Sequence, residues 1–366
     1  MNNSIFNRSV VYTTKKMKQI VITKNGSYDV LKVKESADPV TGEGQIKIQV
    51  KAAGLNFAEI MARQGLYPDA PPLPCVVGYE AAGIVTEVGQ GVDSVKVGDR
   101  VIALSKFGAH SDTMIIPHYM AVPMPEHMSF AEGASIPVNF ITAYHMLFKV
   151  ARVQPGDSVL IHMAAGGVGV AAIQLCKTIK NVTVYGTASA SKHDFIRELG
   201  CHHPIDYNTK DYVKEIYEIN KDLPEGRRGI DIILDPLGDS KKSYSLLNPA
   251  VGRLVTFGAS NFLSGSTRSI FNIASFSPLS LMSDNKMVAG VNIGHMFQPE
   301  SLLHMLQEEM KDIMQLWVDG KVKAIVSKEF TFDDAGEAHR YMEERKNIGK
   351  IILVPTTADL TPTSSQ

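Results

Sequence analysis

Residues 159–172 read VLIHMAAGGVGVAA and decide the fold of the second half of the chain. An apolar run breaks into the turn Ala164-Ala165-Gly166-Gly167-Val168-Gly169, and an alanine-rich, helix-forming segment follows. A strand, a tight turn and a helix start let a pyrophosphate approach the backbone at the positive end of a helix. Ala164 stands where the G-x-G-x-x-G pattern has its first glycine, and glycine turns after strands are common, so the context has to decide.

The flanking sequence favours a dinucleotide site over a simple turn. Residues 155–157 (Pro-Gly-Asp) predict a turn before the strand, and residues 173–176 continue the apolar face of the helix. A second strand over residues 182–186 completes a βαβ unit. Gly166 would then allow close approach of the phosphates, and Gly169 close packing of helix on strand.

The segment after that second strand, TASASK at residues 187–192, lacks the acidic residue with which NAD-binding proteins hold the adenosine ribose. Ser189 and Lys192 instead offer a hydroxyl donor and a cation, which suit a 2′-phosphate. Alternatively, Ser189 caps a helix over residues 194–199 and Lys192 is solvated; both descriptions can hold together. The missing acid favours NADPH over NADH.

Composition sets the class of protein. The 366 residues, 44% of them hydrophobic, are enough for two domains. The net charge of −1 with no basic stripe argues against a nucleic-acid partner. The three cysteines, Cys75, Cys176 and Cys201, are too few for a disulfide framework and suit a reducing, cytoplasmic compartment. The sequence predicts neither a secretory signal nor a transmembrane span.

The predicted secondary structure changes along the chain. Short strands such as residues 19–23, 45–50 and 82–88 predict a barrel-like β domain. From residue 157, strands alternate with helices, which predicts a doubly wound parallel sheet with its ligand at the carboxyl ends. We expect a disordered leader (1–17), a β-rich domain (18–140 and 296–355), a cofactor domain (141–295) and a disordered tail (356–366).

Several motifs resemble a known superfamily: AGLN at residues 53–56, GYEAAG at 78–83, VGDRV at 97–101, the AAGGVG turn, and NIGK at 347–350. Over residues 18–355 the chain resembles the zinc-free quinone oxidoreductase branch of the medium-chain dehydrogenases/reductases. The longer stretches HMAAGGVG, NVTVYGTASASKH, HPIDYNTKDY and DPLG are most similar to the vesicle amine transport protein homologue family. This resemblance implies a GroES-like catalytic domain, a Rossmann domain with NADPH in the cleft between them, a homodimer, and peripheral contact with lipid at vesicle or mitochondrial outer membranes.

The resemblance also implies roles for individual residues. The phosphates would lie on Gly166, Gly167, Val168 and Gly169, and the 2′-phosphate near Ser189, Lys192 and Tyr207. Asn56 and Thr142 match positions near the nicotinamide and its ribose, and Phe257 and Gly258 end the strand beneath the ring. From its sequence position alone, Tyr207 is equally well explained as an aromatic residue packed at a strand end.

Zinc-dependent relatives bring an early cysteine, a histidine in a G-H-E segment and a cluster of four cysteines. Here the early position falls near Asn56, the histidine is replaced by Tyr79, and the cluster is missing, so we expect no metal. Hydrogen-bond donors would then polarise the substrate, and the nicotinamide would supply the hydride. A quinone or another activated alkene accepts hydride at its β-carbon, which favours a reductase.

Tyr67, in RQGLYP at residues 63–68, matches the tyrosine that relatives place at the substrate mouth, where a phenol can donate a proton. The alternative is a loop tyrosine beside a proline-rich segment. Arg63 is expected to be solvated, and His145 and His162 to be structural.

The apolar segment 261–282 predicts a lid or an interface rather than a membrane-surface helix, because it lacks a basic face. A second function therefore stays open: a non-catalytic, NADPH-binding adaptor that acts at membranes through lipid or protein contacts.

Overall fold

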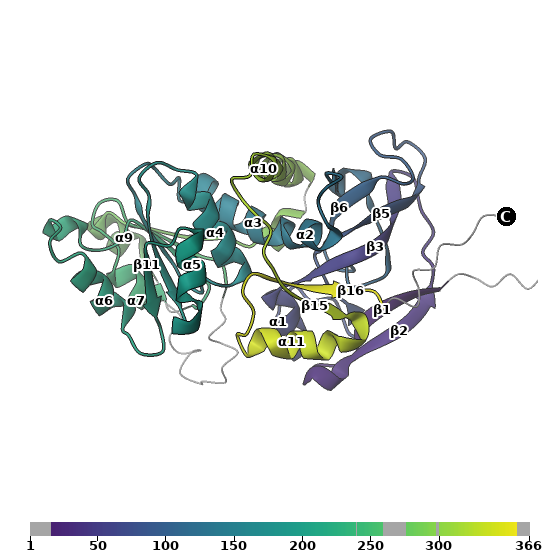
Figure 1. Cartoon of the computed structure of the whole chain (residues 1–366), viewed down its shortest axis with the longest axis horizontal. Coiled ribbons are helices and arrows are strands. Elements are labelled where there is room, and N and C mark those ends of the chain that lie inside the picture. The colour runs from purple at the N-terminus through teal and green to yellow at the C-terminus, as the bar shows by residue number, and fades with distance from the viewer. Residues whose placement is uncertain (1–15, 239, 259–275, 298–299, 357–366) are drawn as a thin grey trace, which may run out of the picture.

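The computed structural model describes residues 16–238, 240–258, 276–297 and 300–356. These residues form a β-rich half and a cofactor half, joined side by side along the long axis of the molecule (Figure 1). The predicted leader and tail lie almost entirely outside the described residues. Lys16 and Met17, which we placed in the leader, instead begin the first strand.

The β-rich half is built from short strands, as its alternation of apolar runs and turns predicts. Its elements are β1 (Lys16–Ile22), β2 (Leu31–Ala37), β3 (Gln45–Leu55), α1 (Phe57–Gln64), β4 (Cys75–Val76), β5 (Glu80–Val88), β6 (Arg100–Leu104), β7 (Thr113–Pro117), β8 (Ala121–Pro123) and α2 (Phe130–Ser135). The long strand β3 pairs with both β5 and β7. Most of its side chains are buried, so β3 forms the centre of this half.

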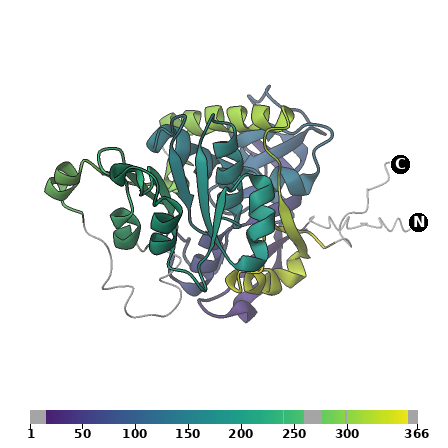
Figure 2. The same cartoon turned by 60° about the vertical axis from the view of Figure 1, so that its left-hand side comes forward.

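The cofactor half is a six-stranded parallel sheet with the order β11-β10-β9-β12-β13-β14. Its elements are β9 (Ser158–Ile161), α4 (Gly167–Lys177), β10 (Thr183–Ala188), α5 (His193–Leu199), β11 (His203–Asp206), α6 (Tyr212–Ile219), β12 (Ile232–Asp235), α7 (Ser240–Ser245), β13 (Arg253–Thr256), α9 (Pro278–Asp284) and β14 (Met287–Gly290). This order reverses between β9 and β12, where such sheets bind ligands at their carboxyl ends. Figure 1 shows α4 and α5 on one side of the sheet and α6 and α7 on the other, and Figure 2 turns the teal strands between them toward the viewer.

The chain then returns to the first half. The returning elements are the short helix η7 (Ile293–Phe297), α10 (Glu300–Val318), β15 (Val326–Thr331), α11 (Ala335–Glu343) and β16 (Lys350–Val354). The last strand, β16, pairs antiparallel with β3 and parallel with β15. The predicted fold, a GroES-like β domain interrupted by a doubly wound cofactor domain, is therefore confirmed.

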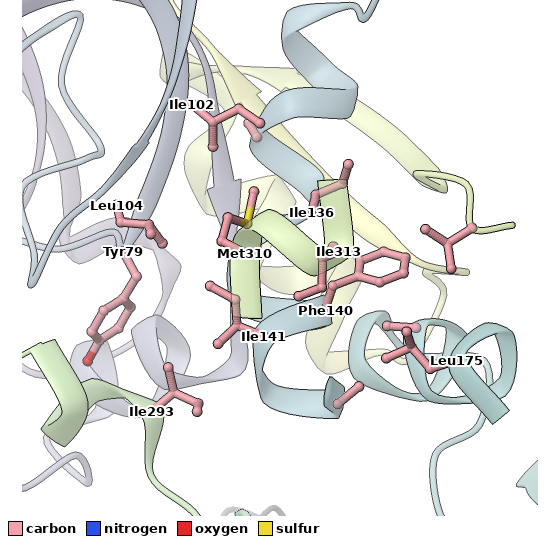
Figure 3. Packing of buried hydrophobic residues seen from close by; sticks show 14 of the residues in the cluster. Tyr79, Ile102, Leu104, Ile136, Phe140, Ile141, Leu175, Ile293, Met310 and Ile313 are labelled. Atoms are coloured by element: carbon pink, nitrogen blue, oxygen red, sulfur yellow. The ribbon is translucent and has the colours of Figure 1, made fainter. Parts of the chain in front are cut away.

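The junction between the halves is packed rather than open. Helix α3 (Pro137–Tyr144) runs without a break across the domain boundary that we predicted between residues 140 and 141. Phe140 and Ile141 of α3 share one buried cluster with Leu175 of α4 and Met310 of α10, as Figure 3 shows. Burial of this apolar surface holds the two halves together.

Helix α10 owes its place at this junction to a periodic apolar stripe. Leu303, Leu306, Met310 and Ile313 recur at spacings of three and four residues, and all four are buried. Within the described part of the chain, neither this helix nor any other combines the length and the hydropathy of a membrane-spanning helix.

Candidate active site

The glycine turn lies at the carboxyl end of β9, at the point where the strand order reverses. Gly166 is the N-cap residue of α4, and within the described chain no side chain caps this helix. The half-exposed Gly167 and Val168 form its first turn. The turn therefore offers backbone N–H groups and the positive helix end to an anion, which fits the pyrophosphate of a dinucleotide.

The glycines of the turn serve different purposes. A Cβ atom on Gly169 would lie 2.6 Å from the carbonyl oxygen of Met163, and one on Gly167 would lie 2.4 Å from the side chain of Asn139. A Cβ on Gly166 would meet only the Met163 carbonyl, at 3.2 Å. Backbone packing thus requires glycine at 169, a Cβ on Gly167 would displace the Asn139 side chain, and Gly166 is the least confined of the three.

Hydroxyl and cationic groups gather beyond the end of β10. Ser189 begins the short helix η4 (Ala190–Lys192), and its side chain makes no capping bond but lies 3.4 Å from the Ser191 hydroxyl. Lys192 Nζ donates to the backbone carbonyls of Arg345 and Asn347, each at 2.7 Å. Burial and the nearby Arg345 lower the pKa of Lys192.

Arg345 is a further cation at this site. Its guanidinium lies 5.6 Å from the ring centre of Tyr207, which is 38% exposed. Two cations, serine hydroxyls and a phenol form a donor set that fits a phosphate monoester better than the two hydroxyls of a ribose. The nearby carboxylate of Asp206 is occupied by Asn208 and Thr209 of its own turn.

Asn56 begins α1 and is held by three charged side chains. Its Oδ1 accepts from Lys350 Nζ at 2.6 Å, and its Nδ2 donates to Glu80 at 3.0 Å and to Glu59 at 3.3 Å. Glu59 also accepts from the Asn56 backbone N–H at 2.9 Å. The amide of Asn56 is thus fully engaged, so it orders the floor of the cleft.

Glu80 and Lys350 form a buried ion pair within this cluster. The pair needs Gly54, because a Cβ there would lie 2.5 Å from a Glu80 carboxylate oxygen. The second carboxylate oxygen of Glu80 accepts from Val138 N at 2.7 Å and so ties the cluster to the first turn of α3.

One ammonium group faces two buried carboxylates in this cluster. Burial raises the pKa of Glu59 to about 7, although Lys350 opposes the rise. Burial also lowers the pKa of His110, which bonds the Gly54 carbonyl, to about 4. Glu59 therefore titrates near neutrality while His110 stays neutral.

Tyr67 lies in the loop after α1, where it faces the segment that leads into η7. A Cβ on Gly294 would lie 3.5 Å from the Tyr67 hydroxyl and 3.8 Å from the ring of Tyr79. Burial raises the pKa of Tyr67, against the effect of the neighbouring Tyr79 hydroxyl. Close by, His295 pairs with Asp69 at 2.7 Å and joins this segment to the Tyr67 loop.

Three further predicted residues lie on α3 and just beyond β13. Thr142 is buried in α3, and its hydroxyl donates to the Val138 carbonyl at 2.6 Å. Phe257 is half-buried just beyond β13, where its N–H donates to the Asp235 carbonyl, and Gly258 is exposed. The structure thus gathers the other predicted residues at the turn, in the donor set beyond β10, and around Asn56 and Tyr67.

The expectation that Arg63 is solvated is wrong. Arg63 is 1% exposed, pairs with Glu343 at 2.7 Å, donates to the Gly26 carbonyl and lies over the Tyr28 ring. The burial of Arg63 could not be predicted from neighbouring residues, because its partner Glu343 is remote in the chain.

His145 pairs with buried Glu309, and His162 lies between the Thr187 and Ser243 hydroxyls. Both therefore have the structural surroundings that we predicted.

Two expectations concern parts of the chain that the structure covers incompletely. The apolar segment 261–282 lies outside the described residues except for residues 276–282, which reach α9. Leu279 and Met282 on that helix are 72% and 69% exposed. Among the residues that the structure describes, no three His, Cys, Asp or Glu side chains are grouped to hold a metal ion. The absence of a metal stays a prediction.

Sequence reasoning missed Glu59, Arg345 and Lys350 as members of the site. Lys350 carried a usable signal, because a lysine opens the apolar final strand directly after Gly349. Glu59 lies three residues after Asn56, the spacing of a capping box. Arg345 gave no local signal, since only the return of the chain brings it to Tyr207.

The chain is similar to known proteins over most of its length. Residues 42–126 match the alcohol dehydrogenase GroES-like domain, and residues 199–353 match a zinc-binding dehydrogenase domain. The human synaptic vesicle membrane protein VAT-1 homolog is 43% identical over 92% of this chain and 86% of its own length.

Two solved structures share the fold. One is that of the human VAT-1 homolog-like protein, which is 34% identical and has a TM-score of 0.82 over 95% of this chain and 99% of its own. The other is that of the Escherichia coli quinone oxidoreductase complexed with NADPH, which is 30% identical with a TM-score of 0.81 over 92% of this chain and all of its own.

The fold and these similarities together define a nicotinamide cofactor-binding medium-chain dehydrogenase/reductase of the zinc-free branch. Within that class the similarity to the VAT-1 proteins extends over nearly the whole chain. The chain belongs to the family of the synaptic vesicle membrane protein VAT-1 homologues.

Proposed function

We propose that this chain is an NADPH-dependent, zinc-independent reductase of quinones or related activated alkenes. The observation that carries the proposal is the half-buried Tyr67, whose hydroxyl lies beside Tyr79 and faces Gly294 of η7. Beside it, the Asn56 cluster forms an ordered, buried floor.

The bound dinucleotide supplies a hydride to the substrate. The turn from Gly166 to Gly169 would hold its pyrophosphate, and Asn56, Thr142, Phe257 and Gly258 would surround the nicotinamide and its ribose. Tyr67 has a raised pKa, so it stays protonated at neutral pH and can donate a proton to an enolate. Glu59, Glu80 and Lys350, which surround Asn56, are buried.

NADPH is favoured over NADH by the donor set beyond β10. Ser189, Lys192, Tyr207 and Arg345 offer hydroxyl and cationic groups, and within the described residues the nearest acid on β11, Asp206, is committed to its own turn. A 2′-phosphate would replace the carbonyl oxygens that Lys192 contacts, because a dianion is a stronger acceptor than a peptide carbonyl. The Escherichia coli relative is complexed with NADPH.

Titration with NADPH and NADH, followed by addition of an ortho-quinone, tests the proposal. The reduced nicotinamide should lose absorbance only when protein and quinone are both present. Tyr67→Phe should lower kcat by about 100-fold, in the range of a lost general acid. Tyr119→Phe is the control, because Tyr119 is exposed on a separate surface helix. Binding of NADPH without turnover across quinones and enones would reject the reductase.

A second candidate is the adaptor that binds NADPH and acts at membranes. It is favoured by the exposed Leu279 and Met282 on α9 and by the vesicle membrane names of the relatives. Under either function we propose a cytoplasmic protein, a homodimer, and peripheral attachment to vesicle or mitochondrial outer membranes. Replacing Leu279 and Met282 by serine should abolish flotation with liposomes if the adaptor is correct, and unchanged flotation would exclude this surface.

A further inference from the structure

Tyr79 has a buried hydroxyl group for which the protein supplies no good acceptor. The residue directly precedes β5 and is 5% exposed, and its ring packs against Phe107 with 5.1 Å between ring centres. Its backbone carbonyl accepts from Ser105 N at 2.9 Å. Among the described residues, no group forms a hydrogen bond of normal geometry with its Oη, and the neighbouring Tyr67 hydroxyl acts on it only as a weak acceptor. A well-fixed, buried hydroxyl with so weak a partner lowers stability, so its presence needs a reason.

The neighbours of this hydroxyl identify where it points. It lies close enough to Tyr67 for the two hydroxyls to influence each other, and Gly294 approaches both rings from across the cleft. Figure 3 shows the Tyr79 oxygen directed away from Leu104 and Met310, toward the segment that carries Ile293. The hydroxyl is thus aimed into the region that we assign to the substrate.

We propose that Tyr79 is a second substrate-contacting residue, whose hydroxyl donates a hydrogen bond to the carbonyl oxygen of an α,β-unsaturated carbonyl substrate. The proposal rests on the reductase function and adds the substrate class and the group that receives its oxygen. Tyr79 would hold the carbonyl oxygen, and Tyr67 beside it would remain free to deliver its proton to carbon.

The chemistry balances with these two residues. Hydride from the reduced nicotinamide forms a C–H bond at the β-carbon, and the alkene electrons move to give an enolate with its charge on oxygen. Tyr79 stabilises that oxygen. A proton from the Tyr67 hydroxyl then forms the C–H bond at the α-carbon, and water reprotonates Tyr67. The nicotinamide is oxidised and the alkene is reduced.

Burial keeps both phenol hydroxyls protonated, so both can act as donors. It raises the pKa of Tyr79, and the hydroxyl of Tyr67 raises it further. Burial also raises the pKa of Tyr67. Each hydroxyl therefore keeps its proton at neutral pH and acts as a donor rather than a base. The surrounding Phe107, Leu104 and Ile293 favour an apolar enone or quinone over a charged acid.

Tyr79→Phe tests the proposal, because it removes the hydroxyl and keeps the ring that packs on Phe107. We expect kcat/KM for an enone to fall by about 10- to 100-fold, as for a lost donor to a developing oxyanion. NADPH affinity should be unchanged, and so should the unfolding midpoint, since the buried hydroxyl that is removed has only a weak partner.

Tyr185→Phe is the matched control. Tyr185 is equally buried, but its hydroxyl donates to Asn220 at 2.7 Å within the cofactor half. This variant should lower the unfolding midpoint and leave kcat/KM unchanged, which is the reverse pattern. A Tyr79→Phe chain with wild-type kcat/KM, or with a lower midpoint together with weaker NADPH binding, would overturn the proposal.

A binding measurement separates this proposal from the reductase function itself. The 4-nitrophenolate ion resembles an enolate, and its visible absorption reports hydrogen bonding to its oxygen. With NADP⁺ present, Tyr79→Phe should weaken its binding by about tenfold and shift its spectrum. If the parent chain never oxidises NADPH, the reductase fails, and this binding still decides the role of Tyr79. If the parent turns over and the variant matches it in both assays, only the role of Tyr79 fails.

Discussion

Glu59 shows how a single residue couples the cleft to pH. It is 1% exposed, accepts from the Asn56 backbone, and shares one ammonium group, Lys350, with Glu80. Its pKa of about 7 in the fold lies above the ordinary value of 4.5, so the folded state binds a proton that the unfolded state has lost between these pH values. Unfolding free energy therefore falls as pH rises from about 4.5 to about 7.

Glu59→Gln should flatten this part of the pH dependence, because an uncharged amide does not titrate. The shift corresponds to roughly 3 kcal/mol between the ends of the window, and urea unfolding at half-unit pH steps would measure it. Glu132→Gln is the control, since Glu132 forms the same capping box on α2 at a more exposed place. An unchanged slope in the Glu59→Gln chain would show that Glu59 is not the titrating group.

The strand, turn and helix at residues 158–177 are packed closely enough that some backbone positions have no room for a side chain. Gly169 packs against the backbone of Met163 and Ala164, whereas Gly166 is less confined, because a Cβ there would meet only the Met163 carbonyl oxygen, at 3.2 Å. The two glycines therefore differ in what they do: the first is needed for folding, and the second for approach of a ligand.

Alanine substitutions should separate these two roles. Gly169→Ala should lower the free energy of unfolding by about 2 to 3 kcal/mol, because the turn must move to accept a Cβ. Gly166→Ala should lower the thermal midpoint less than Gly169→Ala does, because its Cβ would meet one backbone atom at 3.2 Å rather than three within 2.7 Å, while weakening NADPH binding about tenfold. Thermal unfolding and fluorescence titration give both quantities. A Gly166→Ala chain with unchanged midpoint and unchanged affinity would contradict our placement of the phosphates.

At the scale of the molecule, the end of the chain connects its two halves. Gly349 N donates to the Ala165 carbonyl at 3.0 Å, and Lys192 holds the carbonyls of Arg345 and Asn347. The loop before β16 thus touches both the phosphate turn and the donor set. A bound 2′-phosphate would interact with Lys192, the same lysine that joins the halves.

Lys192→Ala should weaken NADPH binding by about 10- to 100-fold and NADH binding much less, because only NADPH places a dianion there. Calorimetric titration with both cofactors measures the difference. Lys210→Ala, which removes a largely exposed lysine paired with Glu215, is the control. Equal losses for the two cofactors would assign Lys192 to joining the halves alone.

The sequence predicted those parts of the molecule that local pattern controls. The alternating strands and helices from β9 to β13, the glycine turn between β9 and α4, and the return of the last strand to the first half were confirmed. It failed where partners are distant: Glu343 buries Arg63, and Lys350 meets Glu80 only after the sheet has formed. The proximity of Tyr79 and Tyr67 likewise depends on how α1 and β5 are placed by their common neighbour β3.

Transfer of deuterium from NADPH labelled at C4 to an enone tests the central claim most directly. Direct hydride transfer in the cleft predicts one deuterium at the β-carbon of the product and none at the α-carbon, which receives a solvent proton. Mass spectrometry and proton NMR of the product locate the label. Product with a single β-deuterium, formed by the parent chain and about 100-fold more slowly by Tyr67→Phe, is the predicted result. Cofactor that stays reduced, or label that appears only in solvent, would contradict a reductase.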